Sequence, residues 1–303
     1  MQALKHMDVT RRINLTSPKQ VCDEVCDLLC TADSAVDKSL VVRAFEVFSQ
    51  LYDGALPGYH RCETLYHDMQ HALDVTLAAA RLMAGHESLH RSHNRLGAER
   101  LTLGIIVALF HDAGYIRHRH DHTRWHGAQY TQVHVARGAR FLSRFLKAEG
   151  CDKWNGRAVK LIHFTGYEIP IDKIRLKDPL DRRLGCLIGT ADLVAQTADR
   201  AYIEKCRVYL FEEFELGGLT RHIGPDGSER VLYHSGEDLL RKTPAFYVMV
   251  KKRLDEDFGR LYDYMEQFFD GKNPYLKAIN RNMAYLQKIL DDGSLTESLR
   301  RRT

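Results

Sequence analysis

The stretch GAERLTLGIIVALFHD, at residues 97–112, decides the fold class of this chain. It is apolar nearly all round, and a helix with no polar face belongs in the interior of a domain. We therefore expect a buried central helix here. The stretch ends in two adjacent polar residues, His111 and Asp112. A buried carboxylate is costly unless it is paired, hydrogen-bonded or bound to a metal ion, so this end of the helix is a candidate site.

Helical patterns dominate the rest of the chain. Ser17 and Gln20 fit a capping box, with Pro18 at the first helical position. The sequence predicts further helices at about 34–52, 64–84, 128–148, 152–163, 179–196, 198–216, 237–259 and 274–291. One segment, RHIGPDGSERVLY at 221–233, indicates either a hairpin with its turn at Pro-Asp-Gly or a surface loop.

These patterns predict an all-α fold, with one compact multi-helix domain over residues 1–303. We expect the core of the candidate site at about 60–220, between flanking helices at 17–52 and 237–291. The tails at 1–15 and 296–303 are expected to be mobile.

Composition argues against several classes of partner. The 44 Lys+Arg and 40 Asp+Glu give a net charge of +4, too even a balance for nucleic acid or an anionic membrane as the main partner. The first residues contain no apolar signal region, and no later run is long enough to span a bilayer. Seven cysteines without a CxxC pair suit reduced thiols. We therefore expect a soluble, cytoplasmic protein.

Two further predicted helices carry polar groups where the apolar pattern indicates burial. His71 lies in the stretch ETLYHDMQHALDV, and Asp192 lies in LGCLIGTADLVAQT. Together with His111 and Asp112, they would form a mixed nitrogen and oxygen site suited to a divalent metal ion. His67 precedes His71 by four positions, so we expect the two imidazoles one turn apart on one helix face.

Three motifs resemble one superfamily of enzymes. YHDMQHALDV at 66–75 is similar to the YHNxxHAxDV motif of class I cyclic-nucleotide phosphodiesterases. HDAG at 111–114 resembles the doublet that names the HD superfamily of metal-dependent phosphohydrolases, and FEEFELGGL at 211–219 is similar to a later segment of the same phosphodiesterases. The resemblance covers about residues 60–220. It implies an HD-type all-α domain that hydrolyses phosphoric esters.

Carried over residue by residue, the resemblance implies a site for two divalent ions, drawn from Fe, Mn, Mg, Zn, Co and Ni. The ligands of the first ion would be His71, His111, Asp112 and Asp192. Asp112 would bridge to the second ion, for which His134 and His163 are the candidate further ligands. Asp74 is expected to support the ligands or cap a helix without binding metal.

The resemblance also implies the course of the reaction. Metal-bound hydroxide would attack phosphorus, and His67 would protonate the departing oxygen as the general acid. A carboxylate, either Asp68 or a glutamate, is expected to keep His67 protonated. The substrate would be a small nucleotide-type phosphoester, such as a cyclic nucleotide. The candidate substrate-binding residues are Arg117, Arg124 and Gln196.

Two other functions would use the same residues. A di-iron oxygenase of the HD type would hold iron with the same histidines and aspartates and would consume oxygen. A nucleotide-binding regulatory domain would bind its ligand tightly with little or no turnover. The sequence favours the hydrolase and leaves both alternatives open.

Overall fold

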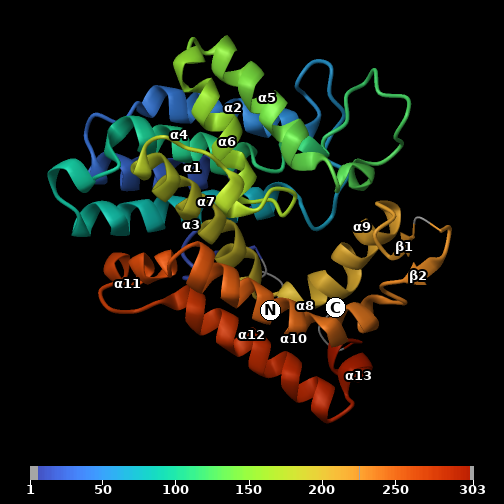
Figure 1. Ribbon diagram of the computed structural model, residues 1–303. Helices are drawn as coiled ribbons and strands as arrows, with labels where there is room; N and C mark the ends of the chain where they lie inside the picture. The colour runs from blue at the N-terminus through green and yellow to red at the C-terminus, as the bar shows by residue number, and fades with distance from the viewer. Residues whose placement is uncertain (1–5, 225, 301–303) are drawn as a thin grey trace.

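The computed structural model of the chain describes residues 6–224 and 226–300. Within these ranges the regular structure is almost entirely helical (Figure 1), so the predicted all-α fold is confirmed. The longer helices are α1 (Pro18–Ala32), α2 (Lys38–Asp53), α3 (Met69–Leu89), α4 (Gly97–Phe110), α5 (His134–Ala148), α7 (Pro179–Ala198), α10 (Gly236–Lys252) and α12 (Pro274–Asp291). The shorter helices are α6 (Asn155–Leu161), α8 (Tyr202–Lys205), α9 (Phe211–Leu216), α11 (Tyr264–Phe268) and α13 (Leu295–Arg300).

Helix α4 is buried along most of its length, as its sequence predicts. Every residue from Leu101 to Phe110 is buried. Helices α3 and α7 pack on α4 and on each other, and Figure 1 shows the three crossing in the middle of the molecule. Because α4 ends at Phe110, the pair His111-Asp112 lies at the point where the chain turns away from this packed centre.

The turn after α4 brings α5 against the end of α4. A Cβ atom at Gly114 would lie 1.8 Å from the carbonyl oxygen of His134, so this approach requires glycine. The close contact places His134, the first residue of α5, beside His111 and Asp112.

Helix α3 begins later than predicted. The expected start at Thr64 is wrong, because the hydroxyl of Thr64 donates to the carbonyl oxygen of His67 inside a loop. Asp68 caps the helix instead, and its carboxylate accepts a hydrogen bond from the backbone N–H of His71 at 2.8 Å. His67 therefore lies in the loop before the helix, whereas His71 lies in its first turn.

Other predicted elements differ in detail. The hairpin at 221–233 is present, with β1 (Arg221–Ile223) and β2 (Glu229–Val231) paired antiparallel. The single helix expected at 198–216 is divided, because a π-helical turn at Cys206–Leu210 separates α8 from α9. Helix α5 begins at His134 and not near 128, since residues 127–130 form a separate 3-10 turn.

Two hydrophobic clusters form the interior. The main cluster includes side chains of α1 to α7 and extends into α12. A smaller cluster links the loop before α3 with the later helices, which lie at the lower right of Figure 1. The buried residues of this second cluster are Tyr66, Tyr202, Ile203, Cys206, Leu239, Leu240, Leu286, Ile289, Leu295 and Leu299.

Much of the expected N-terminal tail is packed against the domain. Met7 and Asn14 form an isolated β-bridge. The buried carboxylate of Asp8 pairs with Arg81 of α3 at 2.8 Å. At the other end, α13 buries Leu299. The first five and last three residues of the expected tails lie outside the described residues.

All seven cysteines are free thiols, and Cys22 and Cys26 are buried along α1. In the part of the chain that the structure describes, no helix has both the length and the apolar character needed to cross a bilayer.

Candidate metal centre

Three helices bring four candidate metal ligands together. His71 comes from the first turn of α3, His111 and Asp112 follow α4, and Asp192 lies in the middle of α7. Nε2 of His71 lies 3.4 Å from Oδ2 of Asp112 and 3.5 Å from Oδ1 of Asp192. Nε2 of His111 lies 3.1 Å from Oδ2 of Asp112 and 3.8 Å from Oδ1 of Asp192. All four side chains are buried.

These separations fit atoms that share one ion. Metal–nitrogen and metal–oxygen bonds of about 2.0–2.2 Å place neighbouring ligand atoms about 3 Å apart. The buried group of His71, His111 and Asp112 could therefore hold a metal ion. Asp192, one of whose oxygens is within 3.8 Å of both histidines, is suitably placed as a further ligand.

The hydrogen bonding of His111 supports a cation at this point. Its Nδ1 lies 2.8 Å from the carbonyl oxygen of Ala108, which can only accept, so Nδ1 carries the proton. In a neutral imidazole Nε2 is then an acceptor, and it faces the acceptor Oδ2 of Asp112. Neither atom has a hydrogen-bond partner among the described residues. Two buried acceptors at 3.1 Å are stable together only with positive charge between them.

The pKa shifts of His111 and Asp112 also favour a cation between the two side chains. Burial by itself lowers the pKa of His111, but the carboxylate of Asp112 outweighs it and raises the pKa to about 9. Burial by itself raises the pKa of Asp112, whereas His111 lowers it well below the usual range. The group therefore attracts a cation, either a proton or a metal ion.

His134 approaches the other oxygen of the same carboxylate. Its Nε2 lies 3.7 Å from Oδ1 of Asp112, and its Nδ1 donates to the carbonyl oxygen of Thr131 at 2.6 Å. Asp112 thus has His71 and His111 beside its Oδ2 and His134 beside its Oδ1, which is the arrangement expected of a bridging ligand. His163 is placed differently, because its Nδ1 pairs with Glu168 and its side chain does not line the cavity at the centre.

His67 lies at the edge of this group, held by a carboxylate. Nδ1 of His67 lies 2.6 Å from Oε2 of Glu213, a buried residue of α9. Oε1 of Glu213 accepts from the backbone N–H groups of Tyr66 at 2.6 Å and His67 at 3.1 Å. Burial alone lowers the pKa of His67, but Glu213 reverses this and raises it to about 9. The carboxylate of Glu213 therefore favours the protonated form of His67.

The carboxylate that contacts His67 is that of Glu213 and not that of Asp68; the sequence left Asp68 and a glutamate as the two candidates. Asp68 is unavailable because it caps α3. Glu213 lies in the FEEFELGGL segment at 211–219, and the resemblance of that segment to the phosphodiesterases was the signal in the sequence that could have identified it.

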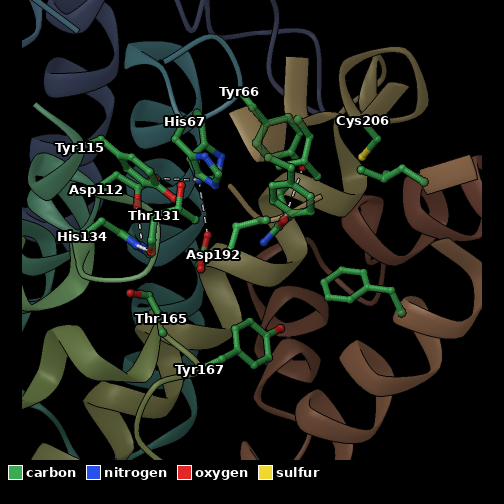
Figure 2. Close-up of a pocket in the computed structure, with 18 of the residues that line it drawn as sticks. Tyr66, His67, Asp112, Tyr115, Thr131, His134, Thr165, Tyr167, Asp192 and Cys206 are labelled. Atoms are coloured by element: carbon green, nitrogen blue, oxygen red, sulfur yellow. Dashed lines mark hydrogen bonds and ion pairs between the residues drawn. The ribbon is translucent and has the colours of Figure 1, made fainter. Parts of the chain in front are cut away.

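Three aromatic rings contact one another beside the metal group. Tyr115, in the turn after Asp112, packs against both His67 and His134, whose own ring centroids are 6.4 Å apart, and Figure 2 labels all three. The ring centroids of Tyr115 and His67 are 4.7 Å apart at 15°, and those of Tyr115 and His134 are 4.4 Å apart at 20°. Contact with Tyr115 limits the rotation of both imidazoles, and all three side chains line one cavity.

The expected phosphate clamp by arginines is not supported. Arg117 binds the carboxylate of Glu63 with two hydrogen bonds, at 2.8 and 2.7 Å, because Glu63 presents both oxygens to the fork of the guanidinium. Arg124 is exposed, and its carbonyl oxygen accepts from Arg117. Neither side chain lines the cavity, whereas Gln196 does, one turn after Asp192 on α7.

Asp74 lies away from the metal ligands. It faces a small separate cavity that Asp8 and Asp199 also line. Burial raises the pKa of Asp74 to about 8, helped by the negative charges of Asp199 and Asp8. Asp74 does not bind the metal group, and it does not cap α3 either, because Asp68 has that position.

The cavity next to the metal group has a volume of about 410 Å³, within the range of small-molecule sites. One end is polar and carries His67, His71, Asp112, His134 and Asp192 (Figure 2). The other end is formed by the later helices, with Cys206 across the cavity from Asp112. The apolar and aromatic side chains of this end include Tyr202, Cys206, Leu210, Phe214, Leu239 and Phe246.

Comparison with known proteins adds no relative on which an assignment could rest. No family model matches the chain, and a search of curated protein sequences finds no match either.

Proposed function

We propose that this protein is a metal-dependent phosphohydrolase of the HD type that acts as a phosphodiesterase. One observation carries the proposal: a buried group of two histidines and two aspartates opens into the cavity that is also lined by His67, which is paired with the carboxylate of Glu213. The group suits divalent ions, and His67 suits proton donation. Hydrolysis of a phosphoester needs both functions at one phosphorus atom.

The ligands would be divided between two ions. His71, His111 and Asp192 would hold the first ion, and His134 would hold the second, with one oxygen of Asp112 directed to each. Bound divalent ions would supply activation of water and neutralisation of the phosphoryl charge. His163 is a weaker candidate for the second ion, because Glu168 already engages its Nδ1.

The residues of the chain carry the proton transfer. Because Glu213 engages Nδ1 of His67, Nε2 is the nitrogen left for the substrate. The oxygen of water forms a bond to phosphorus while the ester P–O bond breaks, and the departing oxygen takes the proton from Nε2. A proton from the attacking water, passed through solvent, restores His67. Such general acid catalysis contributes about 10²–10⁴ in rate.

Hydrolysis of bis(p-nitrophenyl) phosphate by Mn²⁺-loaded protein tests the reaction class. We expect turnover that is lost on chelation and in Asp112→Ala. The same protein should be screened against cyclic mononucleotides, because a nucleotide-type ester is the substrate that the sequence resemblance favours. Oxygen consumption without ester cleavage would instead identify an oxygenase. Tight nucleotide binding without turnover in any metal would identify a regulatory domain.

A further inference from the structure

We propose that the apolar end of the cavity binds the organic group of the substrate, and that this group is a hydrocarbon or aryl group and not a nucleoside. We call this end the apolar arm and define it by Cys206, Leu210, Phe214, Leu239 and Phe246. The inference rests on the proposed function, since it assumes that phosphate binds at the metal end.

The apolar arm is built by the second hydrophobic cluster. Cys206, Leu210 and Phe214 follow one another every four residues through the π-helical turn and α9, so they present one continuous wall. Leu239 and Phe246 come from α10, which packs on the π-helical turn, and they extend the same apolar lining. Burial raises the pKa of the Cys206 thiol to about 12, so this side chain is neutral. A π-helical turn is rare and often occurs at functional sites.

Two of the neutral polar groups beside the arm are already engaged. The hydroxyl of Thr243 donates to the carbonyl oxygen of Leu239 at 3.0 Å. The hydroxyl of Tyr66 donates to the amide oxygen of Gln196 at 3.4 Å. Among the five side chains of the arm, the polar edge of a nucleobase would meet only the weakly hydrogen-bonding thiol of Cys206, and leaving polar groups unpaired costs free energy. A hydrocarbon group has no polar groups to satisfy and would gain from burial in the arm.

Charge also argues against a substrate with several phosphates. Among the described residues, Lys242 is the only lysine or arginine that lines the cavity. Its Nζ already donates to Oδ2 of Asp238 at 2.8 Å and to the carbonyl oxygen of Leu232 at 2.6 Å. A second phosphate in the arm would therefore find no free cationic side chain, so the site suits one phosphate with an apolar substituent.

Binding of non-hydrolysable phosphonates tests the inference without relying on turnover. The probes are methylphosphonate, butylphosphonate and hexylphosphonate, with adenosine 5′-monophosphate as the nucleoside comparison, each titrated into Mn²⁺-loaded protein by calorimetry. We expect the affinity to rise about threefold with each added methylene, because each one leaves water for the arm. Adenosine 5′-monophosphate should bind at least tenfold more weakly than hexylphosphonate. Equal affinity for the three alkyl probes, or tighter binding of the nucleotide, would overturn the inference.

A pair of variants on one helix locates the binding. Phe246 lines the arm, whereas Val248 lies two residues later on α10 and does not line the cavity. Both side chains are partly or largely exposed, at 36% and 67%, so truncation should leave the fold intact. We expect Phe246→Ala to weaken hexylphosphonate binding several-fold and to leave methylphosphonate unchanged, while Val248→Ala changes neither. If Phe246→Ala weakened the binding of both phosphonates, or of neither, the alkyl group would not bind at Phe246.

The two proposals can fail separately. Chain-length-dependent binding without hydrolysis of any ester would support the arm and refute the hydrolase. Hydrolysis of bis(p-nitrophenyl) phosphate together with binding that does not depend on chain length would support the hydrolase and refute the arm.

Discussion

Glu213 holds His67 at 2.6 Å across 146 positions of the sequence. The carboxylate engages both the ring and the backbone of His67, so α9 fixes where this imidazole lies relative to the metal group. The contact also opposes the effect of burial on the pKa of His67. Position and charge of the proposed proton donor therefore depend on one distant residue.

Removal of that charge should change the pH dependence of turnover. In the proposed mechanism the protonated form of His67 is the active acid, and Glu213 favours this form by raising the pKa of His67 to about 9. In Glu213→Gln the negative charge is lost, so the pKa falls and activity disappears at a lower pH on the alkaline side. The pH profile of kcat/KM for an alkyl phosphodiester measures this shift. An unchanged alkaline limb would show that His67 is not the titrating acid.

The loss of turnover in His67→Ala should depend on the leaving group of the ester. We expect His67→Ala to retain its metal, because His67 is held by Glu213 and is not among the ligand atoms. Turnover of an alkyl ester should fall by about 10² or more, since its departing oxygen needs a proton. An aryl ester, whose leaving oxygen needs little protonation, should lose much less. Equal losses on both esters would indicate a positioning role instead.

Removal of a ligand should release metal and lower stability. We expect His111→Ala and Asp112→Ala to lose bound metal by elemental analysis. Their unfolding temperatures should no longer rise when Mn²⁺ is added, because a metal bound to the folded state adds to its stability. Asp74→Asn is a matched control: the residue lies on α3 away from the site, and its raised pKa favours the neutral form. Metal content equal to that of the wild type in all three variants would contradict the site.

The second ion should depend on His134 and not on His163. His134 faces the outer oxygen of Asp112 at 3.7 Å, whereas His163 is paired with Glu168. We therefore expect His134→Ala to bind about half as much metal as the wild type, and His163→Ala to bind a normal amount. Anomalous scattering from crystals would show one peak in the first variant and two in the second. Two peaks in His134→Ala and one in His163→Ala would instead assign the second ion to His163.

The N-terminal segment should contribute to stability through one ion pair. Asp8→Ala would leave Arg81 buried without its counter-charge, a loss of about 3–5 kcal/mol for a pair of this kind. Burial alone raises the pKa of Asp8, but Arg81 and backbone N–H groups together lower it. The contribution is therefore present above the ordinary pKa of 3.8 and is lost as the pH falls below it.

Urea unfolding at pH 7 measures this effect. Asp23→Ala is the control, because Asp23 forms only an exposed pair with Lys19 and should change the free energy of unfolding very little. If Asp8→Ala were as stable as the control, the segment would not be anchored by this pair.

The candidate metal ligands were recognisable in the sequence because they are polar residues in helices whose pattern is otherwise apolar. Asp192 interrupts an apolar run, and His111 with Asp112 ends another. Burial of a carboxylate in such a run is costly without a partner, so local pattern and physical chemistry were enough to select these residues. The all-α fold followed from the same periodicity, since an apolar stripe or an apolar surface all round identifies a helix and its depth.

Tertiary packing alone decided which distant residues meet. Nothing near Arg117 in the sequence shows that Glu63 occupies its guanidinium, and nothing near His67 shows that Glu213 supports it. The apolar arm likewise exists only because α10 packs beside the π-helical turn and both contribute side chains to the cavity. Local patterns report how each segment buries its own surface. The pairing of charges and the shape of the cavity depend on how the helices are placed relative to one another, and that is set by the whole core at once.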